Sequence, residues 1–179
     1  MRVILVGLTL ITGLGADIKF YRERVDIIID NASGVVEGNF FLTNTSPVRL
    51  TPLIFFPFPI DQDHPYPETI AVEEYNYQIC DSGIAIIIPF EPNEKKRLKL
   101  RYRQKIFDQV FTYIVRTIHE WKRPVAEAEF VIVLPASFKN PEINYKVNLV
   151  RKDSLRLIYK IKRKNFYPRD DLQIKWQVE

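Results

Sequence analysis

The sequence predicts an all-β protein, an antiparallel β-sandwich of roughly nine strands with at most one short helix. Apolar and polar residues alternate with period two through much of the chain, as in strands that bury one face. Aromatic residues make up 13% of the chain, and 12 prolines supply turns. No amphipathic helical pattern runs longer than about three turns, so helical crossovers between parallel strands are not expected.

The first half of the chain supplies about four of these strands. Apolar residues alternate with charged ones over 24–29, and Val36, Phe40 and Leu42 fall on one face of the next segment, which ends at Asn44. Residues 55–59 contain two prolines, which lack a backbone donor, so we expect an edge strand or the exit of a strand there. The continuous apolar run over 83–89 is typical of a central strand covered on both faces.

The second half shows the clearest alternation. It recurs over residues 97–106, 143–149, 155–161 and 172–178, and each run predicts one strand with an apolar face. A short helical turn is expected only near residues 119–123. Pro, Asn and Asp turns separate these segments, which indicates antiparallel sheets packed face to face.

The N-terminus resembles an export signal. Met1-Arg2 is a minimal charged region, residues 3–11 are apolar, and residues 13–16 (Gly-Leu-Gly-Ala) offer small residues for cleavage. We therefore expect a signal peptide over 1–16, a single domain over 17–179 and an extracytoplasmic location, periplasmic or secreted. The alternative is a buried N-terminal strand. No apolar run of ~20 residues follows, so no membrane span is expected.

Charge is divided unevenly along the chain. Residues 1–94 carry 5 Lys and Arg against 13 Asp and Glu, whereas residues 95–179 carry 21 against 9. Such an imbalance bears on partners and association rather than on the fold. Cys80 is the only cysteine, which excludes an intramolecular disulfide.

Two stripes of cations follow from the alternation and form a candidate anion-binding surface. One lies on the predicted strand over 97–105 and the other on the strand that begins near 156. Their residues are Arg97, Lys99, Arg101, Arg103, Lys105, Arg156, Lys160 and Lys162. Either acidic strands of the N-terminal half pair with them, or they bind an anionic glycan, an envelope polymer, lipid headgroups or an acidic protein.

Nucleic acid is not an expected partner. Proteins that bind single strands place aromatic rings among the exposed cations, but here Tyr102 and Tyr159 alternate onto the opposite face.

Few residues suggest catalysis. His64 and His119 are the only histidines, and neither a Gly-x-Ser-x-Gly elbow nor a paired-histidine metal motif occurs. Asp61, Asp63 and His64 lie together in a loop that could hold a hard cation, but the twelve-residue calcium-loop pattern is absent. We expect a polar loop, with no metal and no cofactor.

Paired carboxylates leave one enzymatic alternative open. Glu73-Glu74, or Glu127 with Glu129, could serve glycoside chemistry, so the alternative is a carbohydrate-active enzyme on the same scaffold. The alternation of Glu127 and Glu129 with apolar neighbours also fits the outer face of an ordinary strand.

Several segments resemble secreted bacterial β-rich proteins of a domain-of-unknown-function type. They are Phe40 to Asn44, the Phe-Phe-Pro-Phe-Pro run over 55–59, Thr112 to Thr117, the Trp-Lys-Arg-Pro run over 121–124 and residues 128–135. The resemblance implies an extracytoplasmic β-rich fold of unassigned activity and carries over no functional residue. The expected function is that of an exported, non-catalytic module of the cell envelope, binding or structural, that engages anionic surfaces through a cationic sheet face.

Overall fold

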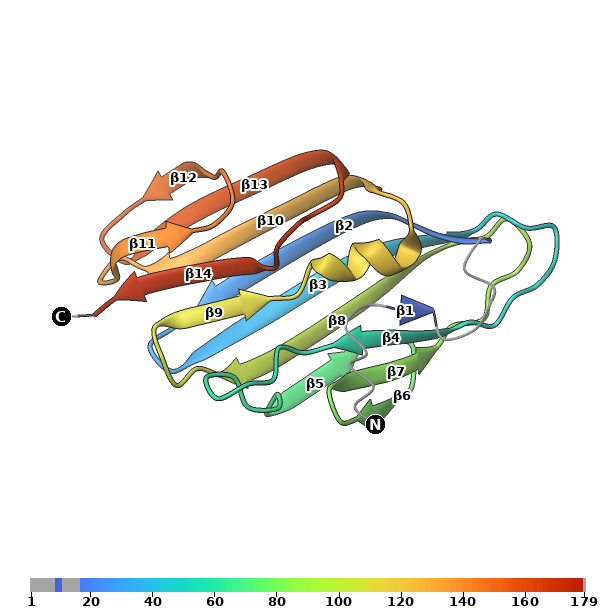
Figure 1. Ribbon diagram of the computed structural model, residues 1–179, viewed down its shortest axis with the longest axis horizontal. Helices are drawn as coiled ribbons and strands as arrows, with labels where there is room; N and C mark the ends of the chain where they lie inside the picture. Colours follow the sequence, from blue (N-terminus) through green and yellow to red (C-terminus); the bar gives the residue numbers. More distant parts are fainter. Residues whose placement is uncertain (1–8, 11–16, 179) are drawn as a thin grey trace.

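The computed structural model describes residues 9–10 and 17–178, and these form an almost wholly β structure with one short helix (Figure 1). The largest unit is a seven-stranded sheet. Its strands, in spatial order, are β12 (Asn148–Lys152), β13 (Arg156–Phe166), β10 (Val125–Pro135), β2 (Ile18–Ile29), β3 (Ser33–Asn44), β8 (Lys95–Lys105) and β5 (Thr69–Val72).

Two smaller sheets pack against one face of this large sheet. The four-stranded sheet has the order β1 (Thr9–Leu10), β4 (Leu53–Pro57), β7 (Gly83–Ile87) and β6 (Tyr77–Cys80). The three-stranded sheet has the order β11 (Lys139–Ile143), β14 (Leu172–Gln177) and β9 (Val110–Tyr113). The 3-10 helix η1 (Arg116–Trp121) follows β9 and lies in front of the large sheet in Figure 1.

Aromatic side chains fill the space between the sheets. Phe56 of β4 contacts the rings of Phe40 and Tyr102 from the large sheet, and Tyr113 of β9 contacts Phe130 of β10. A Cβ on Gly34 would lie 2.4 Å from Cε2 of Phe111, so glycine lets β9 approach β3 closely. The core is thus continuous across all three sheets.

The predicted all-β class and the single short helix are confirmed, but the predicted topology is wrong in two respects. The described residues form fourteen strands in three sheets, not about nine, and β10 pairs with β2 in parallel. Parallel neighbours need a long crossover. Here that crossover consists of the strands and loops between β2 and β10, which contribute to all three sheets, and no helical crossover is required.

Strand boundaries also differ near the C-terminus. The expected strand over 143–149 is divided, because β11 ends at Ile143 and β12 begins at Asn148. The alternation over 155–161 predicts that Leu155 lies on the buried face of the next strand, but Leu155 lies in the turn before β13 and is exposed. The strand β14 agrees with the alternation over 172–178.

Apart from Thr9 and Leu10, the predicted signal peptide over 1–16 lies outside the described residues. These two residues form β1 and pair with Phe55 and Ile54 of β4. No helix in the described parts of the chain has the length and apolar character that a membrane span requires.

Candidate anion-binding face

Both predicted cationic stripes lie on the outer face of the seven-stranded sheet, the face turned away from the two smaller sheets. The strand registers connect them, since Arg103 of β8 is opposite Val35, Val35 is opposite Ile28, and Ile28 is opposite Val133. Val133 in turn is opposite Ile158 of β13. Three strands, β3, β2 and β10, separate the stripes, so they are two distinct regions of one face.

The stripe on β8 is largely paired with acids of the N-terminal half. Glu73 lies within 3.6 Å of Arg97 and Lys99, and Glu37 lies 3.6 Å from Lys99. Four of the five cations have such a partner, and Arg101 has no ion pair within the described part of the chain. Of the two alternatives that the sequence left open, pairing with acids of the N-terminal half is therefore the one that holds for the cations of β8.

The end of β8 nearest its C-terminus is paired in the same way. Glu68 lies 3.8 Å from Arg103 and 3.1 Å from Lys105, and Asp30 lies 4.0 Å from Arg103. Exposed pairs of this kind contribute little to stability, about 0–1 kcal/mol each. They do remove most of the positive potential that this stripe would otherwise present.

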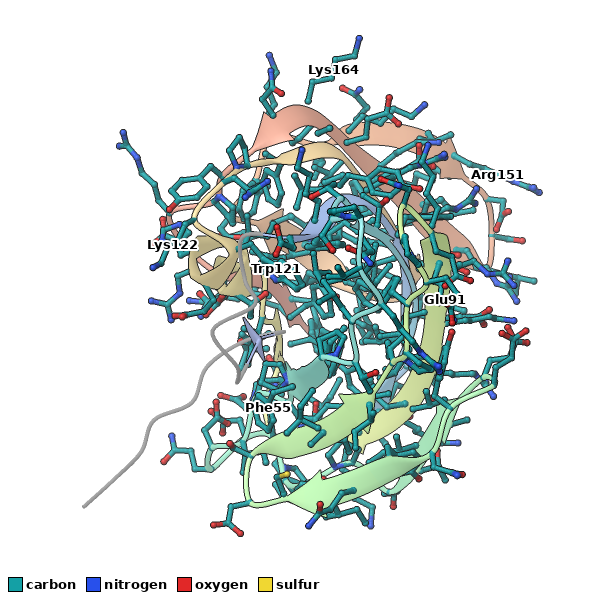
Figure 2. The ribbon with its side chains drawn as sticks, turned by 90° about the vertical axis from the view of Figure 1, so that its right-hand side faces the viewer. Phe55, Glu91, Trp121, Lys122, Arg151 and Lys164 are labelled. Carbon is teal, nitrogen blue, oxygen red and sulfur yellow. The ribbon has the colours of Figure 1, made fainter. Side chains whose placement is uncertain are left out.

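The second stripe belongs to a larger group that we call the cationic edge, the Lys and Arg residues of segment 146–164 on and beside β12 and β13. This segment contains one acid, Asp153. Figure 2 shows Arg151 and Lys164 reaching away from the ribbon. The members of the cationic edge are Lys146, Arg151, Lys152, Arg156, Lys160, Lys162, Arg163 and Lys164.

Few acids oppose the cationic edge. Glu129 of β10 binds Lys160 at 2.8 Å and Lys162 at 3.3 Å, and Asp153 binds Arg151 at 3.0 Å. Burial would raise the pKa of Glu129, but hydrogen bonds and charge from the two lysines outweigh burial and hold that pKa below its usual range. The cationic edge therefore keeps a clear excess of positive charge.

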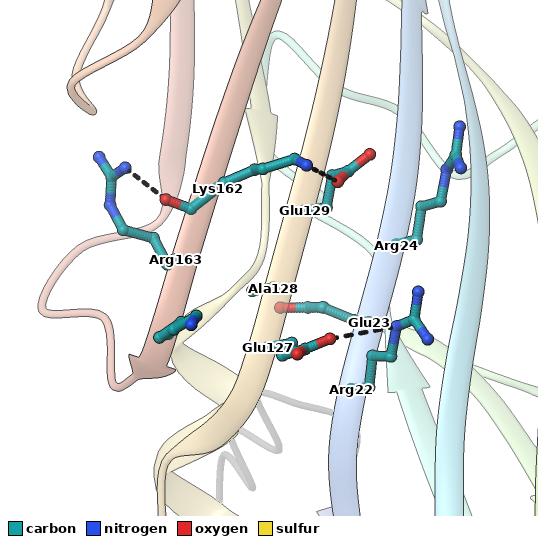
Figure 3. A pocket seen from close by; sticks show the side chains of 9 residues that line it. Arg22, Glu23, Arg24, Glu127, Ala128, Glu129, Lys162 and Arg163 are labelled. Carbon is teal, nitrogen blue, oxygen red and sulfur yellow. Dashed lines mark hydrogen bonds and ion pairs between the residues drawn. The ribbon is translucent and has the colours of Figure 1, made fainter.

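A groove of about 420 Å³ crosses β13, β10 and β2 at the inner border of the cationic edge (Figure 3). It runs between two rows of side chains in which an acid on β10 stands between cations on the neighbouring strands. The ion pair between Arg22 and Glu127, 3.6 Å long, belongs to one row. One row consists of Arg22, Glu127 and Lys164, and the other consists of Arg24, Glu129 and Lys162.

Glu23 lies between the two rows in sequence, but its side chain is buried on the core side of β2 with Val25. Burial raises its pKa to about 8, and its Oε1 atom has no hydrogen-bond partner among the described residues. Sequence reasoning missed this residue. Its phase with Val25, two positions along the strand, was the available signal.

The loop with Asp61, Asp63 and His64 is a structural network. Asp61 Oδ1 lies 2.8 Å from Nδ1 of the buried His64, and Nε2 of His64 accepts a hydrogen bond from the backbone N–H of Thr112. Both ring nitrogens are therefore occupied. Among the described residues, no group of three or more His, Cys, Asp or Glu side chains is arranged to hold a metal ion.

Three of the four candidate carboxylates, those of Glu73, Glu127 and Glu129, are engaged with cations. Glu127 binds Arg22, Glu129 binds two lysines, and Glu73 binds β8. The groove beside Glu127 and Glu129 has no aromatic lining residue. A charged face of this kind suits the binding of ions and charged surfaces.

Comparison with solved structures shows the fold. A protein from Legionella pneumophila described as a "putative nutrient binding protein" matches 94% of this chain and 68% of its own length, with a TM-score of 0.68 and 15% identity. An M1 zinc metallopeptidase from Deinococcus radiodurans matches 89% of this chain with a TM-score of 0.52 and 10% identity. A two-domain M1 zinc metallopeptidase bound to L-tryptophan matches 89% with a TM-score of 0.53 and 9% identity.

The coverage of these proteins differs. The chain spans 42–43% of the length of the two peptidases, and therefore less than half of either. No protein-family model matches the chain, and no curated protein matches its sequence.

Proposed function

We propose that the chain is a non-catalytic binding module of the cell envelope that engages anionic surfaces through its cationic edge. The observation that carries this proposal is the imbalance of segment 146–164, in which eight Lys and Arg residues accompany one acid. The shared fold with a protein described as a "putative nutrient binding protein" is in keeping with a binding role.

The ion pairs assign different roles to the two predicted stripes. Glu37, Glu68 and Glu73 meet the cations of β8 within the chain itself. An external anion there would compete with these acids. At the cationic edge, Glu129 is shared by two lysines, and Lys152, Arg156 and Lys164 have no acid within ion-pair distance in the described parts of the chain. An external anion should therefore bind more strongly at the cationic edge than on β8.

Heparin retention with two matched variants tests this proposal. Lys152, Arg156 and Lys162 are changed to Gln in the edge variant, and Lys99, Arg101 and Arg103 are changed to Gln in the stripe variant. Each variant loses three positive charges, so both have the same net charge. We expect the heparin affinity of the edge variant to fall by up to about a hundredfold, since each of the three surface charges contributes about 0–1 kcal/mol.

The stripe variant should elute near the salt concentration of the wild type, because two of the three cations that it lacks, Lys99 and Arg103, are already paired with neighbouring acids. Wild-type retention should weaken steeply as salt rises to 0.15 M, where the screening length is about 8 Å. Equal losses in both variants would mean that net charge alone is responsible. No retention of the wild type at low salt would refute the proposal.

A further inference from the structure

The tip of the β12–β13 hairpin holds an aliphatic side chain in water at one end of the cationic edge. Leu155 is 74% exposed and is the second-to-last residue of the turn between Asp153 and Arg156. Val150, at the irregularity in β12, is 60% exposed. Arg151, Lys152 and Arg156 flank these two side chains.

The turn that carries Leu155 is held by several hydrogen bonds. Asp153 Oδ1 accepts from the backbone N–H groups of Leu155 and Arg156, both at 2.9 Å, and Arg156 O accepts from Asp153 N–H at 3.1 Å. Leu155 O accepts from the backbone N–H of Ala136 at the end of β10. The backbone therefore presents Leu155 in a fixed position.

Protection of an edge strand accounts for only part of this arrangement. Lys and Arg on an edge strand such as β12 discourage pairing with other chains. Exposed Leu155 and Val150 do not serve that purpose, and they gain nothing from a soluble polyanion, which attracts the cations alone. Aliphatic side chains among cations fit the boundary between anionic headgroups and acyl chains of a bilayer.

We infer that the β12–β13 hairpin docks the protein on an anionic lipid bilayer, with Leu155 entering the boundary between headgroups and acyl chains. This inference rests on the proposed function, because the cationic edge supplies the attraction that brings the hairpin to the surface. It names the class of partner, a lipid bilayer, and it names Leu155 as the residue whose substitution should affect binding to a bilayer but not to a soluble polyanion.

A tryptophan at the tip reports its surroundings in the full chain. The native Trp121 and Trp176 are 4% and 5% exposed, so lipid should not change their emission. Leu155→Trp should shift its emission to the blue on vesicles of phosphatidylglycerol and phosphatidylcholine, and brominated acyl chains should quench it. Vesicles of phosphatidylcholine alone should give no shift.

The matching loss-of-contact variant is Leu155→Ser. It should lower partitioning onto the phosphatidylglycerol vesicles on the order of tenfold, since burial of a leucine side chain is the main term removed. Its heparin retention should equal that of the wild type. The control Ile79→Ser changes another aliphatic side chain, 65% exposed on β6, and should leave both measurements unchanged.

The outcomes separate the two proposals. Heparin retention that depends on the cationic edge, without a Leu155→Trp shift or a Leu155→Ser effect on vesicles, would overturn the bilayer inference and leave the proposed function intact. Equal binding to vesicles with and without phosphatidylglycerol would also overturn it. Absence of binding to both heparin and anionic vesicles would overturn both.

Discussion

Glu23 is a carboxyl side chain that the fold places inside the core. A register shift between Phe20 and Arg22 sets the phase of β2, so that Glu23 points inward with Val25 while Arg24 points outward. Burial raises its pKa from an ordinary value of 4.5 to about 8. The charge of Glu23 also adds to the effect of burial in raising the pKa of Tyr113.

The raised pKa predicts a stability that falls as pH rises. Between pH 4.5 and about 8 the folded chain keeps the Glu23 proton and the unfolded chain does not. The free energy of unfolding should therefore decrease by about 1.4 kcal/mol per pH unit in this window and level off above it. Glu23→Gln should remove that decrease, so the variant should equal the wild type near pH 5 and exceed it by several kcal/mol near pH 8.5.

Urea unfolding at the two pH values measures this difference. Glu127→Gln is the control, because Glu127 lies on the exposed side of the adjacent strand β10 and its carboxylate is already paired with Arg22. Parallel stability curves for wild type and Glu23→Gln across pH 5 to 8.5 would show that the Glu23 carboxyl ionises normally.

At the scale of elements, η1 is held in place by Asp171, an acid that lies 55 residues after Arg116, the first residue of η1. Asp171 Oδ1 accepts from the backbone N–H groups of Val115 and Arg116, and Oδ2 accepts from the Arg116 guanidinium at 2.8–2.9 Å. The bond with Asp171 is the main cause that raises the pKa of Arg116. No local pattern predicts such a contact, because its two halves are distant in sequence.

Removal of this side chain should loosen η1. Asp171→Ala leaves two backbone donors and a guanidinium without their acceptor, so we expect a loss of roughly 1–3 kcal/mol in the free energy of unfolding. Asp170→Ala is the matched control, because Asp170 bonds Tyr145 through its backbone carbonyl, which the substitution keeps. The control should stay within about 0.5 kcal/mol of the wild type. Equal unfolding midpoints for all three proteins would contradict this role of Asp171.

Alternation identified the faces of strands better than their ends. Leu98, Leu100 and Tyr102 are buried and their charged neighbours face water, as the period of two requires. The same pattern continued through Leu155, which is in a turn fixed by Asp153. A period of two does not reveal where hydrogen bonding stops, and side-chain bonds to the backbone can end a strand inside an apolar run.

At the scale of the whole molecule, the charge imbalance of the sequence becomes an imbalance across one sheet. Strand β3 brings Glu37 beside β8, and the residues on either side of β5 bring Glu68 and Glu73. Acids of the first half thus neutralise the first cationic strand of the second half. The positive excess remains on the same face but near the opposite edge of the sheet, on β12 and β13.

The sequence predicted the cations and the face on which they lie, but it did not decide which of them pair with acids of the N-terminal half and which remain available to an external anion. Strand pairing over long separations, such as β3 with β8 or β2 with β10, decides which charges meet. Because alternation is a local property, it does not distinguish a neutralised stripe such as Arg97 to Lys105 from a stripe with free charge.

The most direct test of the cationic edge as the anion-binding surface is a map of amide chemical shifts during titration with a short heparin oligosaccharide. We predict the largest shifts in residues 146–164, with residues 95–105 unchanged. Largest shifts along 95–105 would contradict this account, because they would place the bound anion on β8 in spite of its acidic partners.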